Sequence, residues 1–328
     1  MSKKSLGYSA LIFLLACFSH PAWSQESTGL KKIRIGMPNR GVPNLGLPAA
    51  QRFGFFRAQG LDAELIVMRP SVSLQTLLAG DLDYSTVLAS GARASVSGLP
   101  LRIVMALTVG QDFSLVVRPE IRRMEDLKGK TLAVSGVGEF TDVGTRLVLK
   151  KYGLVPEVDV KLRALYSNHP LRLSALQAGQ IDGTVMSMPY NKMAVKMGFR
   201  ELVQLREFIK TPQGGLVTTV QKIRSEPDLV LRTIKAALMA NRFLRENKGE
   251  FTKLLARESG IHDQEVAGLI HEEAVKLFSD TGLVSDGVMQ EFIANSKETL
   301  KVSREISISE VADFSFARRA ISDLKQGR

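Results

Sequence analysis

The sequence predicts an α/β protein made of two similar lobes, followed by a helical C-terminal part. Three observations lead to this fold class. A helix–turn–strand pattern at residues 74–87 returns at 173–185, strand-like and helix-like segments alternate over 31–117, and the apolar spacing after residue 225 is helical. The alternation favours a mostly parallel sheet, because parallel strands need crossover connections such as helices.

The repeat reads Leu-x-x-Leu-x-Ala-Gly-x-[Leu/Ile]-Asp, followed by a short apolar run that contains Thr-Val. Leucines three apart form the apolar stripe of a helix, and Gly80 and Gly179 suit the left-handed backbone that ends it. The Asp then makes the corner before a β-branched strand. A common α/β turn recurring by chance is the alternative, but the helix, its stop and the strand all coincide. We therefore expect two equivalent α/β units.

The remaining elements follow from the same patterns. The expected strands lie at 33–37, 63–68, 84–88, 101–108, 112–117, 131–134, 158–165, 183–186, 202–203 and 216–220. An early helix is expected at 47–59, and Ser71 or Ser73 suits the N-cap of the helix that ends at Gly80. The expected helices of the C-terminal part, which we interpret as scaffold, lie at 227–245, 247–257, 262–278, 286–298 and 309–325.

The N-terminal segment is typical of a secretory signal peptide at residues 1–24. Two lysines at 3–4 precede an apolar block at 10–18. Ala22 and Ser24 then supply the small residues of a cleavage site. The expected location of the protein is therefore the periplasm.

Cys17 leaves a second interpretation of the N-terminal segment open, that of a lipoprotein signal. It ends a lipobox-like stretch and would become the lipidated first residue, although Leu15 is bulkier than lipoboxes usually keep at that position. A buried N-terminal helix is the third interpretation. Cys17 is the only cysteine, so cleavage after residue 24 would leave a protein without disulfides, thiol catalysis or cysteine–metal sites.

Composition and charge are those of an ordinary globular protein with a basic surface. Of the 328 residues, 45% are hydrophobic, and the formal net charge is +11. Such a charge suits nucleic acid, an anionic membrane surface or an anionic ligand. The expected export and the scattered placement of the basic residues argue against nucleic acid. No internal apolar run reaches the roughly 18–20 residues of a membrane span.

No catalytic constellation is present in the sequence. Of four histidines, one belongs to the predicted leader, two fall in the helical part without sharing a helix face, and His169 stands alone beside a proline. Metalloprotease, nucleophile-elbow and Walker motifs are absent, and Gly136-x-Gly138 is only a fragment of a dinucleotide fingerprint. We therefore predict a non-enzymatic protein with no catalytic residue, no metal and no cofactor.

Loops at the carboxyl ends of strands, opening onto helix N-termini, form the candidate ligand site. Open parallel sheets bind ligands there, and the free N–H groups of a helix N-terminus favour an anion or a polar acceptor. The candidate ligand-binding residues are Asn39, Arg40, Ser71, Val72, Ser73, Leu88, Ala89, Ser90, Gly138, Phe140, Thr141, Met186 and Met188.

Each of these candidates also has a structural interpretation. The serines could be ordinary helix caps, and the two methionines and Phe140 could pack in the core. Arg40 is the best single charge for an anionic group, although a solvated loop arginine would look the same. If Arg40 pairs with an anion, Arg40→Ala should cost about 1.5–3 kcal/mol of binding free energy.

Five motifs carry a resemblance to a known family over residues 31–300. They are Ile33-Arg-Ile-Gly36, Gly54-Phe-Phe56-x-x-x-Gly60-Leu61, Leu77-Leu-Ala-Gly80-Asp-Leu-Asp83, Asp126-Leu-Lys-Gly129-Lys130 and Leu176-Gln-Ala-Gly179-Gln-Ile-Asp182. The chain resembles the solute-binding proteins of ABC importers of the aliphatic sulfonate, nitrate and taurine type. This group also includes binders of thiamine pyrimidine precursors. The motifs are specific to the fold and say little about the ligand.

The resemblance implies a type II periplasmic-binding fold, in which two crossovers at about 110–118 and 212–220 join the lobes. Lobe one would comprise residues 31–112 and 218–328, and lobe two residues 118–212. A small molecule would be captured in the cleft as the lobes close, and delivered to an ABC permease in the inner membrane. We expect a monomer.

The cleft loops depart from the more polar loops of the family's sulfonate binders. Val72, Leu88, Ala89, Met186 and Met188 stand at the matching places. They favour a ligand with apolar surface plus one anionic or polar end, such as a sulfonate, carboxylate or heterocycle. Two alternatives stay open. One is an enzyme on the same fold resembling the pyrimidine synthases, although the cysteine-rich iron-binding segment of such enzymes is missing. The other is a ligand sensor for a membrane receptor.

Overall fold

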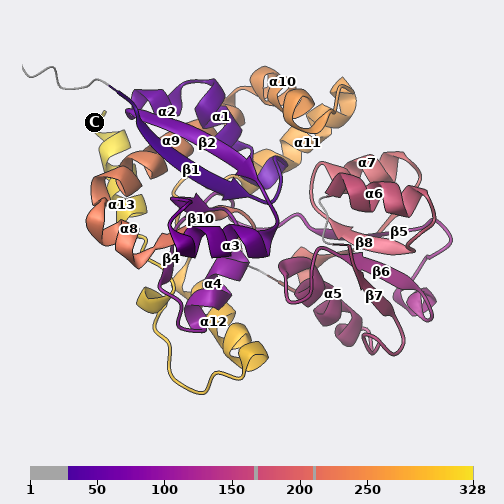
Figure 1. The fold of residues 1–328 in the computed structure, drawn as a ribbon. Helices are drawn as coiled ribbons and strands as arrows, with labels where there is room; N and C mark the ends of the chain where they lie inside the picture. Colours follow the sequence, from indigo (N-terminus) through magenta and orange to yellow (C-terminus); the bar gives the residue numbers. More distant parts are fainter. Residues whose placement is uncertain (1–28, 166–168, 210–211, 328) are drawn as a thin grey trace, which may run out of the picture.

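The computed structural model describes residues 29–165, 169–209 and 212–327 (Figure 1). The predicted leader and the lipobox lie outside the described residues. The chain forms two five-stranded sheets, each flanked by helices, which stand side by side in Figure 1. Within the described ranges, no helix is both long enough and apolar enough to span a bilayer.

The first sheet has the strand order β2-β1-β3-β10-β4. Its strands are β1 (Lys31–Met37), β2 (Leu61–Val67), β3 (Tyr84–Ser85), β4 (Leu101–Ala106) and β10 (Gly215–Thr219). β1 pairs in parallel with β2 and β3, whereas β10 runs antiparallel to β3 and β4.

The second sheet has the order β7-β6-β8-β5-β9. Its strands are β5 (Ser114–Val117), β6 (Thr131–Val134), β7 (Lys161–Ala164), β8 (Gly183–Met186) and β9 (Arg200–Gln204). β6 pairs in parallel with β7 and β8, and β5 is antiparallel to β8 and β9. The fourth strand of each sheet is thus the one that enters from the other sheet. This confirms the predicted class, two α/β units joined by two crossings.

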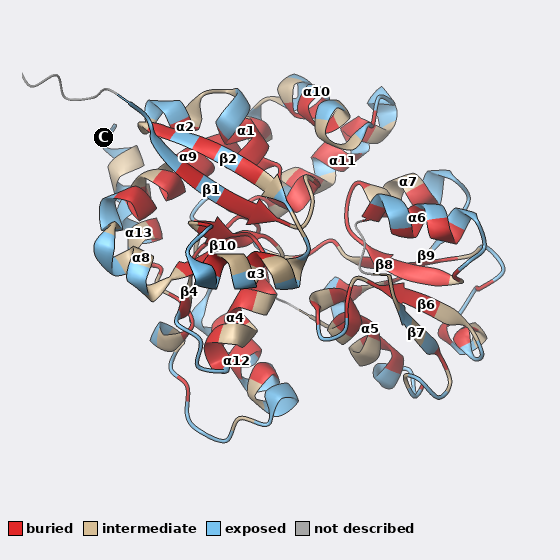
Figure 2. Ribbon diagram, in the orientation of Figure 1, coloured by how far each residue is buried: buried red, intermediate tan, exposed pale blue. Residues whose placement is uncertain are grey.

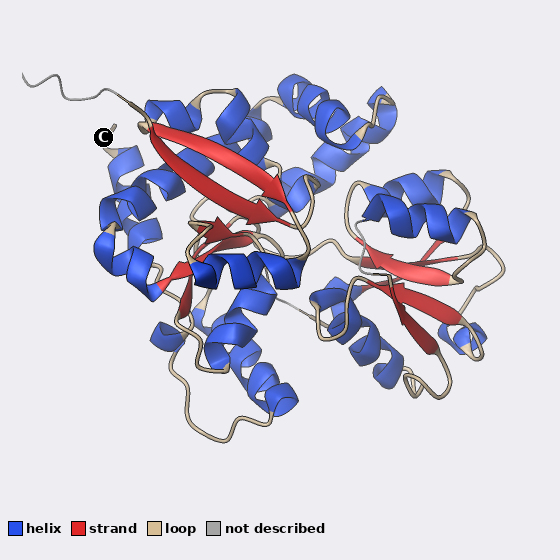
Figure 3. Ribbon diagram, viewed as in Figure 1, coloured by secondary structure: helices blue, strands red, loops and turns tan. Residues whose placement is uncertain are grey.

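Helices flank both sheets (Figure 3). Those of the first unit are α1 (Gly46–Arg52), α2 (Phe55–Ala58), α3 (Pro70–Ala79), α4 (Leu88–Val96), α8 (Val220–Ser225), α9 (Pro227–Glu246), α10 (Lys248–Ser259), α11 (Gln264–Leu277), α12 (Asp286–Leu300) and α13 (Ser315–Lys325). Those of the second are α5 (Phe140–Lys151), α6 (His169–Gln177) and α7 (Tyr190–Lys196). Short 3₁₀ turns are η1 (Val42–Asn44), η2 (Met124–Leu127), η3 (Leu205–Glu207) and η4 (Ile308–Glu310).

Two local predictions in the first unit are wrong. The helix predicted at 47–59 is broken, because Gly54 takes a φ of +78° and starts the separate helix α2. Neither Ser71 nor Ser73 caps α3, because this helix begins at Pro70 and both serines lie inside it. A proline in the first turn suits a helix start, since its missing N–H has no helical partner there.

The two copies of the repeat fold in the same way. Their glycines take φ values of +86° and +69° and end α3 and α6, as predicted. The repeat Asp then does the same work in each copy. Asp83 accepts the backbone N–H of Arg34 in β1 at 2.7 Å, and Asp182 accepts that of Thr131 in β6 at 2.8 Å. Each Asp therefore ties its strand to the parallel neighbour.

Each unit has its own apolar core, seen as red strands and helix faces in Figure 2. In the first unit, Ile33 and Ile35 of β1 pack in one cluster with Leu229 and Ile234 of α9. The long helix α9 also packs against α1 and α13. The C-terminal helices thus support the first sheet, as the sequence predicts for a scaffold.

Candidate ligand-binding site

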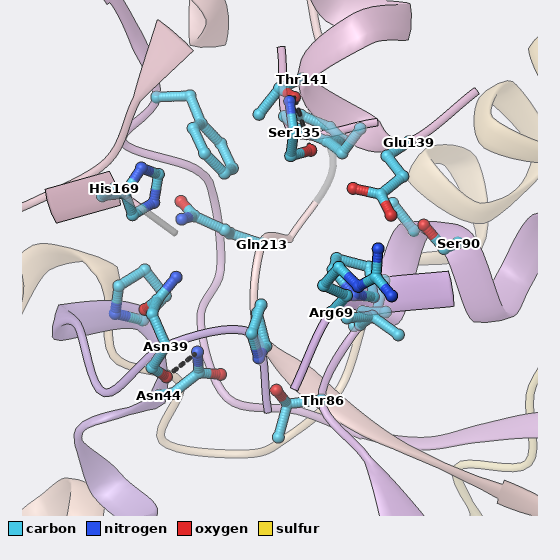
Figure 4. Close-up of a pocket in the computed structure, with 18 of the residues that line it drawn as sticks. Asn39, Asn44, Arg69, Thr86, Ser90, Ser135, Glu139, Thr141, His169 and Gln213 are labelled. Atoms are coloured by element: carbon cyan, nitrogen blue, oxygen red, sulfur yellow. Dashed lines mark hydrogen bonds between the residues drawn. The ribbon is translucent and has the colours of Figure 1, made fainter. Parts of the chain in front are cut away.

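A cavity of about 330 Å³ lies where strand ends and helix N-termini of the two units face each other (Figure 4). One wall comes from the loops after β1, β2 and β3. The other comes from Phe113 before β5, the loop after β6, and the first turns of α5 and α6. Pro212 and Gln213, from the connection that returns to the first sheet, complete the lining. Open parallel sheets bind ligands at this position.

The first wall consists mainly of small, apolar and uncharged polar side chains. Leu88, Ala89 and Ser90 open α4, directly after Thr86 at the end of β3. Asn44 donates its side-chain N–H to the carbonyl of Asn39 at 3.1 Å. This wall also carries a cation, since Arg69 lines the cavity at the start of α3.

The second wall carries a buried arginine held by a histidine. Arg172 Nη2 lies 2.8 Å from His169 Nδ1, and His169 Nε2 lies 3.0 Å from the hydroxyl of Ser187. Because a guanidinium can only donate, Nδ1 accepts and Nε2 carries the ring proton. Burial, and next the charge of Arg172, hold the pKa of His169 well below its usual range. The imidazole is therefore neutral, and both its nitrogens are engaged.

Arg172 keeps its charge although it is almost fully enclosed. Its side chain is among the largest that are fully buried, at 2% exposure. Burial lowers its pKa to about 10, and the negative charge of Glu139 acts in the opposite direction. A guanidinium with this pKa is charged at neutral pH. The cavity thus contains a fixed positive charge that can pair with an anionic group.

The loop after β6 is shaped by its own hydroxyl groups. The Thr141 hydroxyl oxygen accepts the N–H of Ser135 at 2.9 Å and lies 2.8 Å from the Ser135 hydroxyl. Phe140 stacks on Phe113 with ring centroids 4.8 Å apart. Glu139 is the N-cap residue of α5 and lines the cavity. This loop therefore supplies an aromatic surface, hydroxyl groups and one carboxylate.

Arg93 of α4 links the two units beside the cavity. Its Nη2 donates to the Ser90 hydroxyl at 3.3 Å and, across the gap, to the carbonyl of Gly138 at 3.3 Å. Burial lowers the pKa of Arg93, and the charge of Glu139 opposes that shift. This hydrogen bond joins the two units next to the cavity.

The structure brings about half of the predicted site residues to the cavity. The residues in its lining are Asn39, Leu88, Ala89, Ser90, Phe140 and Thr141. The residues that lie elsewhere are Arg40, Ser71, Val72, Ser73, Gly138, Met186 and Met188. Contact between the first group and a ligand stays a prediction.

Arg40 is directed away from the cavity, which corrects its interpretation as the anion partner. Its Nη1 donates to Glu258 at 2.9 Å, and its Nη2 donates to the carbonyl of Leu65 at 3.2 Å. The turn after β1 therefore points Arg40 toward α10. The alternative of a loop arginine on the surface was closer to the structure.

Ser73 of α3 and the two methionines are buried packing residues. Ser73 is buried, with its hydroxyl 2.7 Å from that of Ser85, and only Arg69 and Pro70 at the start of α3 line the cavity. Met186 is fully buried in a core cluster of the second unit, and Met188 belongs to the large core of the first. The core-packing alternative therefore describes both methionines.

Several lining residues were not among the candidate residues, although the loop at 135–141 was one of the expected strand-end loops. The missed residues with polar or charged side chains are Asn44, Arg69, Thr86, Ser135, Glu139, His169, Arg172 and Gln213. A signal existed for one pair, since His169 and Arg172 are three apart at a helix start and such residues lie on one helix face. His169 was wrongly interpreted as isolated.

The fold and this cavity together define a class of two-unit α/β folds with a cavity between the strand ends of the two units. A protein-family model described as NMT1/THI5 like matches residues 44–250, and the chain belongs to this family. Two solved structures support the fold. One is of a Bordetella bronchiseptica RB50 protein (TM-score 0.79, 19% identity, 90% of this chain and 98% of that one). The other is the periplasmic nitrate-binding protein NrtA from Synechocystis PCC 6803 (TM-score 0.73, 14% identity, 90% and 89%).

Two curated relatives are similar in sequence. The taurine-binding periplasmic protein of Escherichia coli K12 is 27% identical over 211 residues, which covers 60% of this chain and 63% of that protein. The nitrate import ATP-binding protein NrtC of Synechocystis is 26% identical over 263 residues, which covers 72% of this chain and 39% of that protein. The chain thus spans less than two thirds of either relative. The desulfurization enzyme DSZB shares the fold at a TM-score of 0.61 and 15% identity.

Proposed function

We propose that this protein is a solute-binding protein that holds one small molecule between its two units and delivers it to an ABC importer. The cavity lined from both sheets, with the buried Arg172 in its wall, carries this proposal. A ligand that contacts both walls favours the closed arrangement over an open one, and this differential affinity drives closure. The sequence similarity to a taurine-binding and a nitrate-import protein supports the same role.

The ligand we propose has an anionic end and an apolar part. Arg172 and Arg69 offer positive charge, and Phe113, Phe140 and Leu88 offer apolar surface. Small sulfonates, carboxylates and acidic heterocycles fit this description. The proposed location is the periplasm, the proposed partner is a permease in the inner membrane, and the proposed state is a monomer.

Binding without catalysis is part of the proposal, although one enzyme shares the fold. A histidine in a cavity is the usual general base. Here the ring nitrogens of His169 are engaged by Arg172 and Ser187, so neither is available to a substrate. Among the residues that the structure describes, no three His, Cys, Asp or Glu side chains are grouped to hold a metal ion. Turnover of a bound ligand by the purified protein alone would contradict this part.

The test is ligand identification followed by a stability measurement. Native mass spectrometry of the protein purified without denaturation should reveal a bound small anion. A thermal-shift panel of sulfonates, carboxylates and heterocycles should raise the melting temperature, since a ligand adds RT ln(1 + [L]/Kd) to stability. A protein that carries no ligand and responds to no member of the panel would contradict the proposal.

A further inference from the structure

We propose that Glu139 makes the site selective for ligands that carry a nitrogen–hydrogen donor in addition to their anionic end. This inference rests on the proposed function and narrows the class of ligand. Glu139 lines the cavity and is only 8% exposed. Its Oε2 is buried and has no hydrogen-bond partner among the described residues. Figure 4 shows the carboxylate directed into the cavity.

The carboxylate of Glu139 accepts no capping hydrogen bond from helix α5. Glu139 stands at the N-cap of α5, where a side chain often accepts a backbone N–H of the first turn, but it makes no such bond. The glycine at position 136 instead leaves room for the carboxyl group of Glu139. A Cβ at Gly136 would lie 2.9 Å from Cδ of Glu139, so a side chain at position 136 would displace it. The loop thus places Glu139 Oε2 at the cavity, where this acceptor has no hydrogen-bond partner among the described residues.

The two charges of this wall require different ligand groups. An ionised carboxylate only accepts hydrogen bonds, and a guanidinium only donates them. An anion alone can pair with the charge of Arg172 but meets repulsion from Glu139. A ligand that also carries an ammonium or aromatic amino group can pair with both charges, through a charge-assisted hydrogen bond to Glu139 Oε2.

The opposite wall offers further unused acceptors. Thr86 Oγ1 and Asn44 Oδ1 also lack hydrogen-bond partners within the described part of the chain, and these residues are 2% and 4% exposed. The amide nitrogen of Asn44 is already used on Asn39. Three buried polar atoms, Glu139 Oε2, Thr86 Oγ1 and Asn44 Oδ1, therefore border one cavity from three separate segments of the chain. Such atoms are normally paired, so their alignment here points to a ligand.

The experiment compares ligands that differ in one group. Calorimetric Kd values are measured for 2-aminoethanesulfonate, 2-hydroxyethanesulfonate and ethanesulfonate, and for 4-aminobenzenesulfonate against benzenesulfonate. We expect the amino member of each set to bind the wild-type protein at least tenfold more tightly. Glu139→Gln should bring that ratio below about threefold, whereas Glu291→Gln, an exposed residue of α12, should leave it unchanged.

The outcomes separate two kinds of failure. If no probe of either set binds, the proposed function fails and this inference fails with it. If the members of each set bind equally, if the hydroxyl compound matches the amino compound, or if Glu139→Gln keeps the wild-type ratio, only the inference is overturned. Should Glu139→Gln not fold, Glu139→Asp supplies the mutational comparison. This variant retracts the carboxylate by one methylene and should lower the wild-type ratio, and an unchanged ratio would overturn the inference.

Discussion

The two sheets share one strand order, but the walls that they present to the cavity differ in charge. Relative to the first leucine of each repeat, Ser73 in α3 and Arg172 in α6 occupy the same position. Ser73 bonds to Ser85 inside the first unit, whereas Arg172 extends to His169 and lines the cavity. A duplicated framework therefore tolerates different side chains at one position. The framework residues are repeated, and the residues that line the cavity are not.

Asp112 lies in the connection from β4 to β5, and its protonation gives the largest expected effect on stability. Its carboxylate accepts the N–H of Met188 at 2.7 Å, and its own N–H donates to Gln213 of the return connection at 3.0 Å. Burial raises the pKa of Asp112 from 3.8 to about 7. The folded protein therefore binds a proton more readily than the unfolded chain between these values. This group's contribution to stability is full below pH 4 and is lost as the pH rises to 7.

Asp112→Asn should remove this pH dependence while keeping the shape. The free energy of unfolding of the wild-type protein should fall, relative to that of the variant, by about 3 kcal/mol or more between pH 4 and pH 7. Urea denaturation at pH 4, 5.5 and 7 measures the difference. Asp81→Asn, at an exposed position, is the control. Parallel pH profiles for the wild type and Asp112→Asn would show that Asp112 titrates normally.

Replacing the residue at the equivalent position of each repeat, Arg172 or Ser73, tests the difference between the walls. Arg172→Gln should weaken binding of benzenesulfonate by about 1.5–3 kcal/mol, because a charged hydrogen-bond donor to the anion is lost. Ser73→Ala should leave the affinity unchanged and lower the free energy of unfolding by about 1–2 kcal/mol, because Ser85 loses its partner. Calorimetry and urea denaturation measure the two quantities. Wild-type affinity in Arg172→Gln would remove this residue from the site.

This difference also explains which features could be predicted from the sequence. The repeat glycines and aspartates act through the local backbone, so spacing alone predicts the helix ends and strand starts. The candidates Asn39, Leu88 and Phe140 line the cavity because each lies shortly after a strand, and the ends of parallel strands meet at one edge of a sheet. The fold class and the general position of the site were therefore predictable.

The charged part of the site was not predictable from the same patterns. Arg172 lies inside α6, and helical spacing does not say which face turns toward the second unit. The role of His169 depends on Ser187, which is distant in sequence and adjacent in the fold. Arg40 shows the opposite error: it follows a strand end, but an ion pair with Glu258 turns it outward. Tertiary contacts of this kind decide the direction of a side chain.

The repeat aspartates test the shared part of the framework. Asp83→Ala and Asp182→Ala should each lower the free energy of unfolding by about 1–2 kcal/mol, because a strand N–H loses its acceptor. Asp83→Ala should lower the free energy of unfolding more than Asp182→Ala does. Asp83 also pairs with Lys222 at 2.6 Å, whereas Arg118 lies 3.8 Å from Asp182. Urea denaturation checks both, and the Asn variants, which keep an acceptor, should recover most of the loss. An effect confined to one unit would mean that the copies do not serve the same purpose.

Arg40→Ala is expected to have the smallest effect, and it distinguishes the two loops that follow β1 and β6. The side chain of Arg40 pairs with Glu258 and does not line the cavity. The affinity for benzenesulfonate should stay within about twofold, and the free energy of unfolding should fall by about 1 kcal/mol, as for a partly exposed ion pair. Calorimetry and urea denaturation measure these changes. A tenfold loss of affinity would instead place Arg40 in the binding machinery and give the loop after β1 the anion-binding role that we assign to Arg172 and Arg69.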